Sequence, residues 1–144
     1  MPLHLLKLCV GAESVTDLED WIRQNLASQA SRGAVPEQFH TTRMVPTRTE
    51  ELLSGGSLYW VIRGEVACRQ QLIAIRPFVD PDGIRRCHLV LDPTVWKVEP
   101  RSNRPFQGWR YLAHKDIPPD LTGGEGGAAL PEEMSRELRF LGLL

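Results

Sequence analysis

The stretch Ser57-Leu58-Tyr59-Trp60-Val61-Ile62-Arg63 decides the fold class, because aromatic and β-branched residues fill most of it. Such residues favour a strand, and this stretch is the strongest strand signal in the chain. Gly64 follows and predicts a bend or a tight turn, and residues 65–77 predict another strand. The centre of the chain is therefore expected to be β structure.

Short turns join this region to further strands. Asp80-Pro81-Asp82-Gly83 is a turn sequence, because proline presets the second position and glycine tolerates positive φ at the fourth. It leads to a predicted strand at residues 84–91, and Asp92-Pro93 makes another turn before a strand at residues 95–98. Strands linked by short turns are typical of a meander or a small barrel.

The N-terminal part predicts a strand, a helix and another strand. Residues 3–10 are mostly apolar and predict a buried strand, and residues 39–45 predict a second one. Between them, Thr16-Asp17-Leu18-Glu19 matches a capping box, which opens helices by satisfying free backbone donors. The helix that follows is expected to bury a stripe at helical spacing, made of Leu18, Trp21, Ile22 and Leu26.

Two shorter helices are also predicted. A second capping box, Thr47-Arg48-Thr49-Glu50, opens a helix that ends before Gly55-Gly56. Residues 122–128 are a flexible linker by composition, and residues 130–142 predict a C-terminal helix. We expect residues 1–144 to form a single domain of the α+β class. Its predicted architecture is a small, mostly antiparallel, partly open β-barrel with flanking helices.

The composition fits one ordinary globular domain. The chain has 144 residues, of which 42% are hydrophobic and 24% are charged, so we do not expect the chain to be disordered throughout. No apolar run approaches the roughly 20 residues that span a bilayer, and no basic leader precedes the apolar start. We therefore expect a cytoplasmic protein with no membrane partner. Cys9, Cys68 and Cys87 are isolated and are expected to be structural thiols.

The net charge of −1 is unevenly distributed along the chain. Residues 1–39 carry 3 basic and 5 acidic side chains (−2), residues 40–115 carry 12 and 7 (+5), and residues 116–144 carry 2 and 6 (−4). A basic middle suggests an anionic partner, and the alternative is that the acidic ends pair with the middle in the fold.

The sequence shows no catalytic constellation. His4, His40, His88 and His114 are scattered without metal-ligand spacing, and no phosphate-binding loop or nucleophile-elbow motif is present. We therefore expect no metal, no cofactor and no catalytic residue.

Three arginines and three aromatic residues are interleaved in residues 101–111. Arginines can bind phosphates and aromatic rings can stack on bases, and proteins that recognise single-stranded RNA use this combination. The alternative is that the aromatic rings fill the core and the arginines pair with acids. Arg63 and Arg69 lie in predicted strands, where each needs an acceptor from a protein carboxylate or a ligand. A tight turn at Gly64 would bring their side chains close together. The candidate binding residues are Arg43, Tyr59, Arg63, Arg69, Arg104, Trp109 and Arg110.

Three hypotheses about function follow. The first is a module that binds RNA or a nucleotide in a cleft of these arginines, with Tyr59 or Trp109 as the stacking platform. The second is a small-molecule enzyme that acts on a nucleotide-like anion, with Glu65 or His88 as the base. The third is an adaptor or assembly protein that uses exposed aromatic residues and the C-terminal helix. The sequence leaves the oligomeric state open.

Two resemblances accompany these hypotheses. Residues 43–69 resemble the start of the PUA-like superfamily, especially its ASCH branch, through Met44-Val45-Pro46, a short helix, Gly55-Gly56 and a strand that ends at Arg63. This resemblance implies a small, partly open barrel that binds RNA or a modified nucleobase near Pro46, Gly55, Gly56 and Arg63. Catalytic ASCH members have a lysine just after the glycine, where this chain has Ser57 and Leu58.

The whole chain is similar to a family of short bacterial proteins known as a domain of unknown function. The features that carry this similarity are Leu5-Leu6-Lys7-Leu8, residues 55–62 and residues 105–112. This similarity implies no activity.

Overall fold

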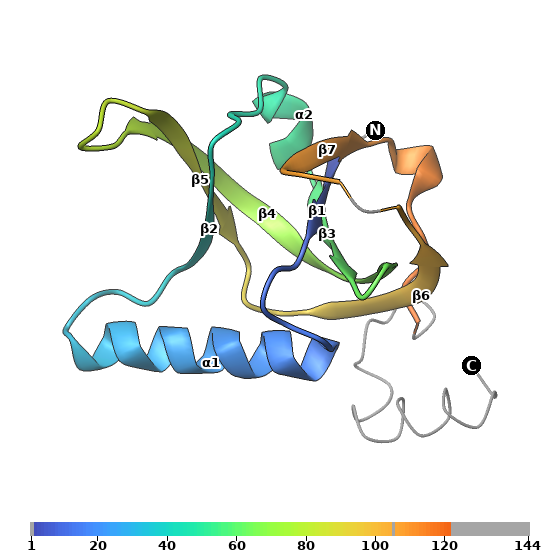
Figure 1. The fold of residues 1–144 in the computed structure, drawn as a ribbon, viewed down its shortest axis with the longest axis horizontal. Coiled ribbons are helices and arrows are strands. Elements are labelled where there is room, and N and C mark those ends of the chain that lie inside the picture. Colours follow the sequence, from blue (N-terminus) through green and yellow to red (C-terminus); the bar gives the residue numbers. More distant parts are fainter. Residues whose placement is uncertain (1, 105, 122–144) are drawn as a thin grey trace.

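The computed structural model describes residues 2–104 and 106–121 (Figure 1). Its elements, in chain order, are β1 (His4–Leu8), α1 (Val15–Ser31), β2 (Gln38–Thr42), α2 (Thr49–Leu53), β3 (Ser57–Ile62), β4 (Glu65–Val79), β5 (Arg85–Leu91), β6 (Trp96–Ser102), β7 (Trp109–Leu112) and a short 3₁₀ helix (His114–Asp116).

The strands form one seven-stranded sheet in the order β2-β5-β4-β3-β1-β7, and β6 pairs with β4 off this path. Every pairing in the sheet is antiparallel except that of β1 with β3. The sheet is not closed, so the predicted class, an α+β fold with a partly open and mostly antiparallel sheet, is confirmed.

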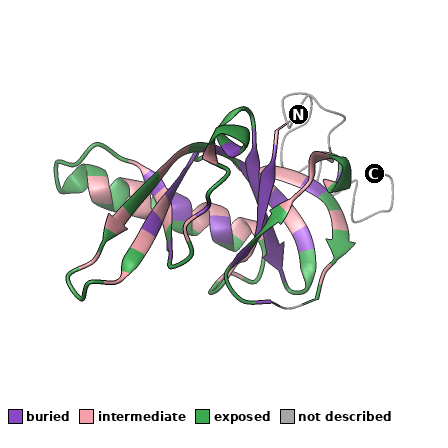
Figure 2. Cartoon of the chain, turned by 90° about the horizontal axis from the view of Figure 1, so that it is seen from above, coloured by how far each residue is buried: buried purple, intermediate pink, exposed green. Residues whose placement is uncertain are grey.

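The long strand β4 divides the sheet into two parts. Its first half pairs with β3 and β6, and together with β1 and β7 it makes the curled half of the sheet. Its second half pairs with β5, which pairs with β2, and these three make the arm. Figure 2 shows buried residues concentrated in the curled half and exposed residues toward the free end of the arm.

Two hydrophobic cores lie on opposite faces of β3, and this explains why all of its residues are buried. Leu58, Trp60 and Ile62 face the helix-side core, to which α1 contributes Leu18 and Ile22. The other core, the curl core, lies inside the curled half. Its buried members are Leu6, Tyr59, Val61, Val66, Val98 and Phe106.

Two buried glutamines hold a polar network in the helix-side core. The Trp60 ring Nε1 donates to Gln70 Oε1 at 2.9 Å, and Gln70 Nε2 donates to the Asp92 carbonyl oxygen at 2.9 Å. Gln38 and Gln70 also bond to each other through their amides. Such pairing removes the cost of burying an amide, so these residues hold β2, β3 and β4 in register.

The structure corrects both predicted capping boxes. α1 begins at Val15, because Ser14 is extended and its hydroxyl accepts from the Asp17 backbone N–H at 3.1 Å. α2 has no side-chain cap, since the backbone N–H of Thr47 donates to the Tyr111 hydroxyl instead. Trp21 does not belong to the buried stripe of α1, because 49% of it is exposed.

Most predicted strands are present with shifted ends. β2 stops at Thr42 rather than continuing to residue 45, and β6 continues to Ser102, four residues beyond the predicted end. The predicted linker at residues 122–128 and the predicted helix at residues 130–142 lie outside the described residues. Neither helix of the described part of the chain is long and apolar enough to cross a bilayer.

Candidate functional site

Residues 103–108, here called the crossing segment, run from the end of β6 to the start of β7 across one end of the curled half (Figure 1). At its start, the backbone N–H of Asn103 donates to the Gly64 carbonyl oxygen at 2.8 Å. Further along, Phe106 inserts into the curl core. These contacts hold the segment at Asn103 and at Phe106, and residue 105 between them lies outside the described part of the chain.

Three of the candidate arginines border this segment, and we call them the arginine rim. Arg63 lies in the β3–β4 turn beside Asn103, and Arg104 lies on the segment itself. The Arg110 guanidinium lies over the Phe106 ring, 5.0 Å from its centroid. All three are exposed, and none forms an ion pair with a carboxylate of the described residues.

Arg43 lies in the chain after β2, next to a residue that contacts the start of β7. It precedes Met44, whose carbonyl oxygen accepts from the Trp109 ring Nε1 at 2.7 Å. Arg43 is exposed as well, but it is not one of the three arginines of the rim.

Arg69 lies away from the crossing segment. The prediction that the side chains of Arg63 and Arg69 lie close together is therefore wrong. Gly64 does form a tight turn, but Arg69 lies four residues after Glu65, about 13 Å along the strand. Its guanidinium binds Asp120, with Nε donating to Oδ1 at 2.9 Å and Nη2 donating to Oδ2 at 2.7 Å. A protein carboxylate is therefore the acceptor that this arginine requires.

Tyr59 and Trp109 do not offer open stacking faces. Tyr59 is 1% exposed and Trp109 is 5% exposed, because Tyr59 packs in the curl core and Trp109 packs in the helix-side core. Within residues 101–111, the alternative that aromatic residues fill the core is therefore correct for Trp109 and for Phe106. Tyr111 is the aromatic residue of β7 that remains accessible, at 36% exposure, and Arg48 lies over its ring.

A cavity of about 300 Å³ adjoins the curl core at Tyr59 and Ile117, and sequence reasoning missed it. Arg69 and Asp120 form part of its wall, together with His4, Ser57, Tyr59 and His114. His4 alternates with Leu6 on one face of β1, which is a weak signal for an inward-facing polar group. His114 and Asp120 come from the chain after β7, and no motif connects them to β1 or β3.

Hydrogen bonds organise the polar groups of this cavity. The backbone N–H of Ser57 donates to His4 Nδ1 at 3.0 Å, and His4 Nε2 lies 2.9 Å from His114 Nδ1. Arg69 Nη1 donates to the Ser57 hydroxyl oxygen at 3.0 Å. Burial lowers the pKa of His4 to about 4, with further lowering by His114 and Arg69.

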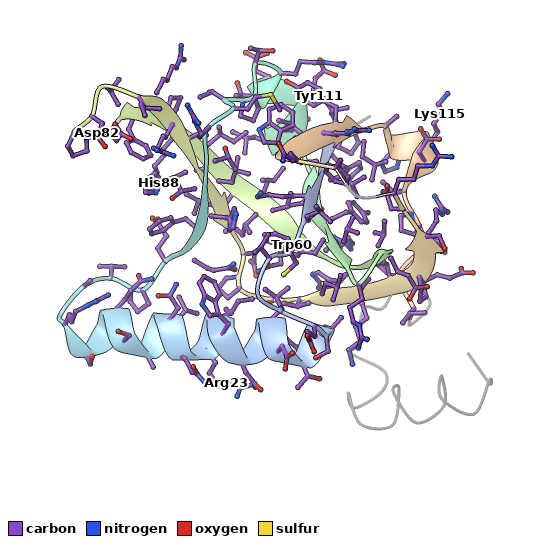
Figure 3. All side chains as sticks on the ribbon, in the orientation of Figure 1. Arg23, Trp60, Asp82, His88, Tyr111 and Lys115 are labelled. Carbon is purple, nitrogen blue, oxygen red and sulfur yellow. The ribbon has the colours of Figure 1, made fainter. Side chains whose placement is uncertain are left out.

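The two residues considered as an enzymatic base do not line this cavity. Glu65 is exposed beside the β3–β4 turn. His88 lies on the arm between the rings of Phe39 and Phe78, each at a centroid distance of 4.4 Å. Figure 3 shows it far from Lys115, the neighbour of the cavity residue His114. Neither lines the second cavity of about 340 Å³ near Trp60 and α1. The enzyme hypothesis therefore stays a prediction, and neither of these two cavities supplies it with Glu65 or His88 as a base.

The cysteines of the described chain behave as structural thiols. Cys68 and Cys87 are buried, and burial raises the pKa of Cys9 to about 11, so its reactive thiolate form is disfavoured at neutral pH. In the part of the chain that the structure covers, no three His, Cys, Asp or Glu side chains form a group that could hold a metal ion.

Comparison with known proteins gives one match. A search of curated proteins and a search of solved structures each found no similar protein. The matching family model is described as "Protein of unknown function (DUF1489)" and covers residues 5–144. The whole-chain similarity is thereby confirmed, whereas the local resemblance of residues 43–69 to the PUA-like superfamily stays a prediction. The chain therefore belongs to the DUF1489 family.

Proposed function

We propose that this protein binds single-stranded RNA through the arginine rim. The observation that carries the proposal is the grouping of Arg63, Arg104 and Arg110 along one segment, exposed and without a carboxylate partner among the described residues. Positive side chains that border one groove or edge can track a phosphate backbone without reading its bases.

The backbone of Arg63 supports a functional role for its side chain. Arg63 and Gly64 form a two-residue hairpin turn, and their φ angles are +52° and +79°. Turns with positive φ at both positions favour Asn, Asp or Gly at the first, and a residue with a Cβ costs roughly 1–2 kcal/mol there. The chain places an arginine at this position although its guanidinium contacts no carboxylate of the described residues.

The burial of Tyr59 and Trp109 shapes the expected binding mode. Because neither ring can stack on a base, phosphate contacts are expected to supply most of the affinity. Tyr111 lies on the face of β7 opposite Arg110, and Arg43 lies in the chain that contacts that face. An RNA strand that continues past β7 would reach them there. The protein is therefore expected to show weak sequence preference and strong salt dependence.

The test compares two triple variants with the wild type. Arg63→Gln/Arg104→Gln/Arg110→Gln removes the rim, whereas the control removes three arginines elsewhere: Arg23 and Arg32 on or beside α1, and Arg85 on the arm. Both variants change the net charge equally. Binding of a short fluorescent single-stranded RNA at low salt should weaken about tenfold or more in the rim variant and about twofold or less in the control.

Two results would remove the proposal. One is a wild-type protein that does not bind RNA at low salt. The other is an equal loss of affinity in both triple variants, because that would reflect net charge rather than the rim.

A further inference from the structure

The cavity beside Arg69 presents hydrogen-bonding groups from separate parts of the chain. Its volume is about 300 Å³, at the lower limit for small-molecule sites. Residues 117–119 form one largely apolar wall. The polar lining comes from β1, β3, β4 and the chain after β7, namely His4, Ser57, Tyr59, Arg69, His114 and Asp120.

The positions of the histidine protons follow from one backbone donor. The Ser57 backbone N–H can only donate, so His4 Nδ1 must accept and His4 carries its proton on Nε2. That proton is donated to His114 Nδ1, which leaves the proton of a neutral His114 on Nε2. His4 stays uncharged at neutral pH, because a second proton on Nδ1 would face the Ser57 N–H.

The formal charges in the described cavity wall cancel. Arg69 and Asp120 neutralise each other through their two hydrogen bonds. An added carboxylate or phosphate would meet the charge of Asp120, and an added cation would meet the charge of Arg69. Neither kind of ion is favoured in such a half-buried site.

The wall nevertheless offers both donors and acceptors. The Ser57 hydroxyl oxygen already accepts from Arg69, so its own hydrogen is available for another acceptor. Burial raises the pKa of Tyr59 to about 12, so its phenol keeps its hydrogen at neutral pH. Each Asp120 oxygen accepts from Arg69 and keeps a further lone pair for an N–H donor.

We infer that this cavity binds a small, uncharged molecule that carries an amide group. The amide oxygen accepts from the hydroxyls of Ser57 and Tyr59, its N–H donates to Asp120, and its hydrocarbon part lies against residues 117–119. The site is separate from the arginine rim and does not depend on RNA binding.

Three probes of the same size and shape test the chemistry of the site in the full-length protein. Benzamide is an uncharged amide, benzoate is an anion and benzamidine is a cation. In ¹H–¹⁵N NMR titrations at pH 7.5, benzamide should shift the backbone amide signals of residues 55–59, 69, 114–117 and 120, and the two ions should leave them unchanged. Stronger binding of either ion than of benzamide, or no binding of any probe up to 20 mM, roughly the weak-fragment range, would overturn the inference.

Single-atom variants test the contacts. Ser57→Ala and Tyr59→Phe each remove one donor and should weaken benzamide binding roughly three- to tenfold. Tyr111→Phe removes a hydroxyl outside the cavity and is the control, with affinity expected to stay within about twofold of the wild type. The triple arginine-rim variant should also bind benzamide normally. Unchanged affinity in both Ser57→Ala and Tyr59→Phe, or an equal loss in Tyr111→Phe, would contradict the assigned contacts.

Discussion

Arg69 and Asp120 are 51 residues apart in sequence and form a two-point ion pair, with N···O distances of 2.9 and 2.7 Å. Their side chains are 23% and 18% exposed, so the pair is largely shielded from water. It attaches the chain after β7 to the first half of β4, next to the isolated bridge between Val98 and Asp120. The pair therefore helps to keep β6 and the last described residues on the curled half.

Replacement of Asp120 by alanine is expected to lower the free energy of unfolding by about 2 kcal/mol, because it leaves Arg69 half-buried without its acceptor. Asp20→Ala breaks the exposed Arg23–Asp20 pair and should cost about 0.5 kcal/mol or less. Urea denaturation of both variants measures the difference. Equal losses would show that the Arg69 pair contributes no more than an exposed one.

Gly56 is the second position at which a single change should be severe. A Cβ built on Gly56 would overlap the carbonyl oxygens of Leu3 and Leu52, which are backbone atoms that cannot rotate away. Gly56→Ala is therefore expected to cost about 3 kcal/mol or more in stability. Gly33→Ala is the control, since its φ of +79° is strained but no atom lies within 4 Å, and its cost should be about 1 kcal/mol. Thermal or urea unfolding of both variants measures these losses. A loss of stability in Gly56→Ala no larger than that in Gly33→Ala would contradict the close packing at Gly56.

Stability should fall when the pH drops below neutral, because burial lowers the pKa of His4 and of His40 to about 4 in the folded protein. Between the ordinary histidine pKa of 6.5 and about 4, the unfolded chain binds more protons than the folded one, so acid favours unfolding. The His4 contribution is complete above pH 6.5, and roughly 2 kcal/mol of it should be lost by pH 5.

The variant His4→Asn tests this assignment, because its amide oxygen can still accept from the Ser57 N–H but does not titrate. Urea denaturation at pH 7.5 and pH 5 should show a smaller pH dependence in the variant than in the wild type. The same loss of stability in both proteins would mean that His4 is not its source.

The sequence was sufficient to predict most of the elements, because their signals are local. Aromatic and β-branched residues marked β3, and the Asp80–Gly83 turn marked the hairpin between β4 and β5. The capping boxes failed for a physical reason. Ser14 lies two residues before Thr16 and reaches the Asp17 N–H, so the helix had a competing cap of equal chemistry.

The candidate site was harder to predict, because it depends on long-range contacts. Three of the five candidate arginines do border the crossing segment. The stacking role expected of Tyr59 and Trp109 failed because both rings are buried, and which strand faces are buried depends on the whole sheet. The cavity could not be predicted from the sequence, because His4 and His114 are 110 residues apart and no local pattern indicates their contact.

The salt dependence of RNA binding tests the central claim most directly. For single-stranded nucleic acid, each phosphate neutralised by a cationic side chain adds about −0.7 to the slope of log affinity against log salt concentration. Removing Arg63, Arg104 and Arg110 together should make this slope shallower by about 2, whereas the Arg23, Arg32 and Arg85 control should keep the wild-type slope. A rim variant with the wild-type slope would show that these three arginines do not contact the phosphates and would contradict the proposed function.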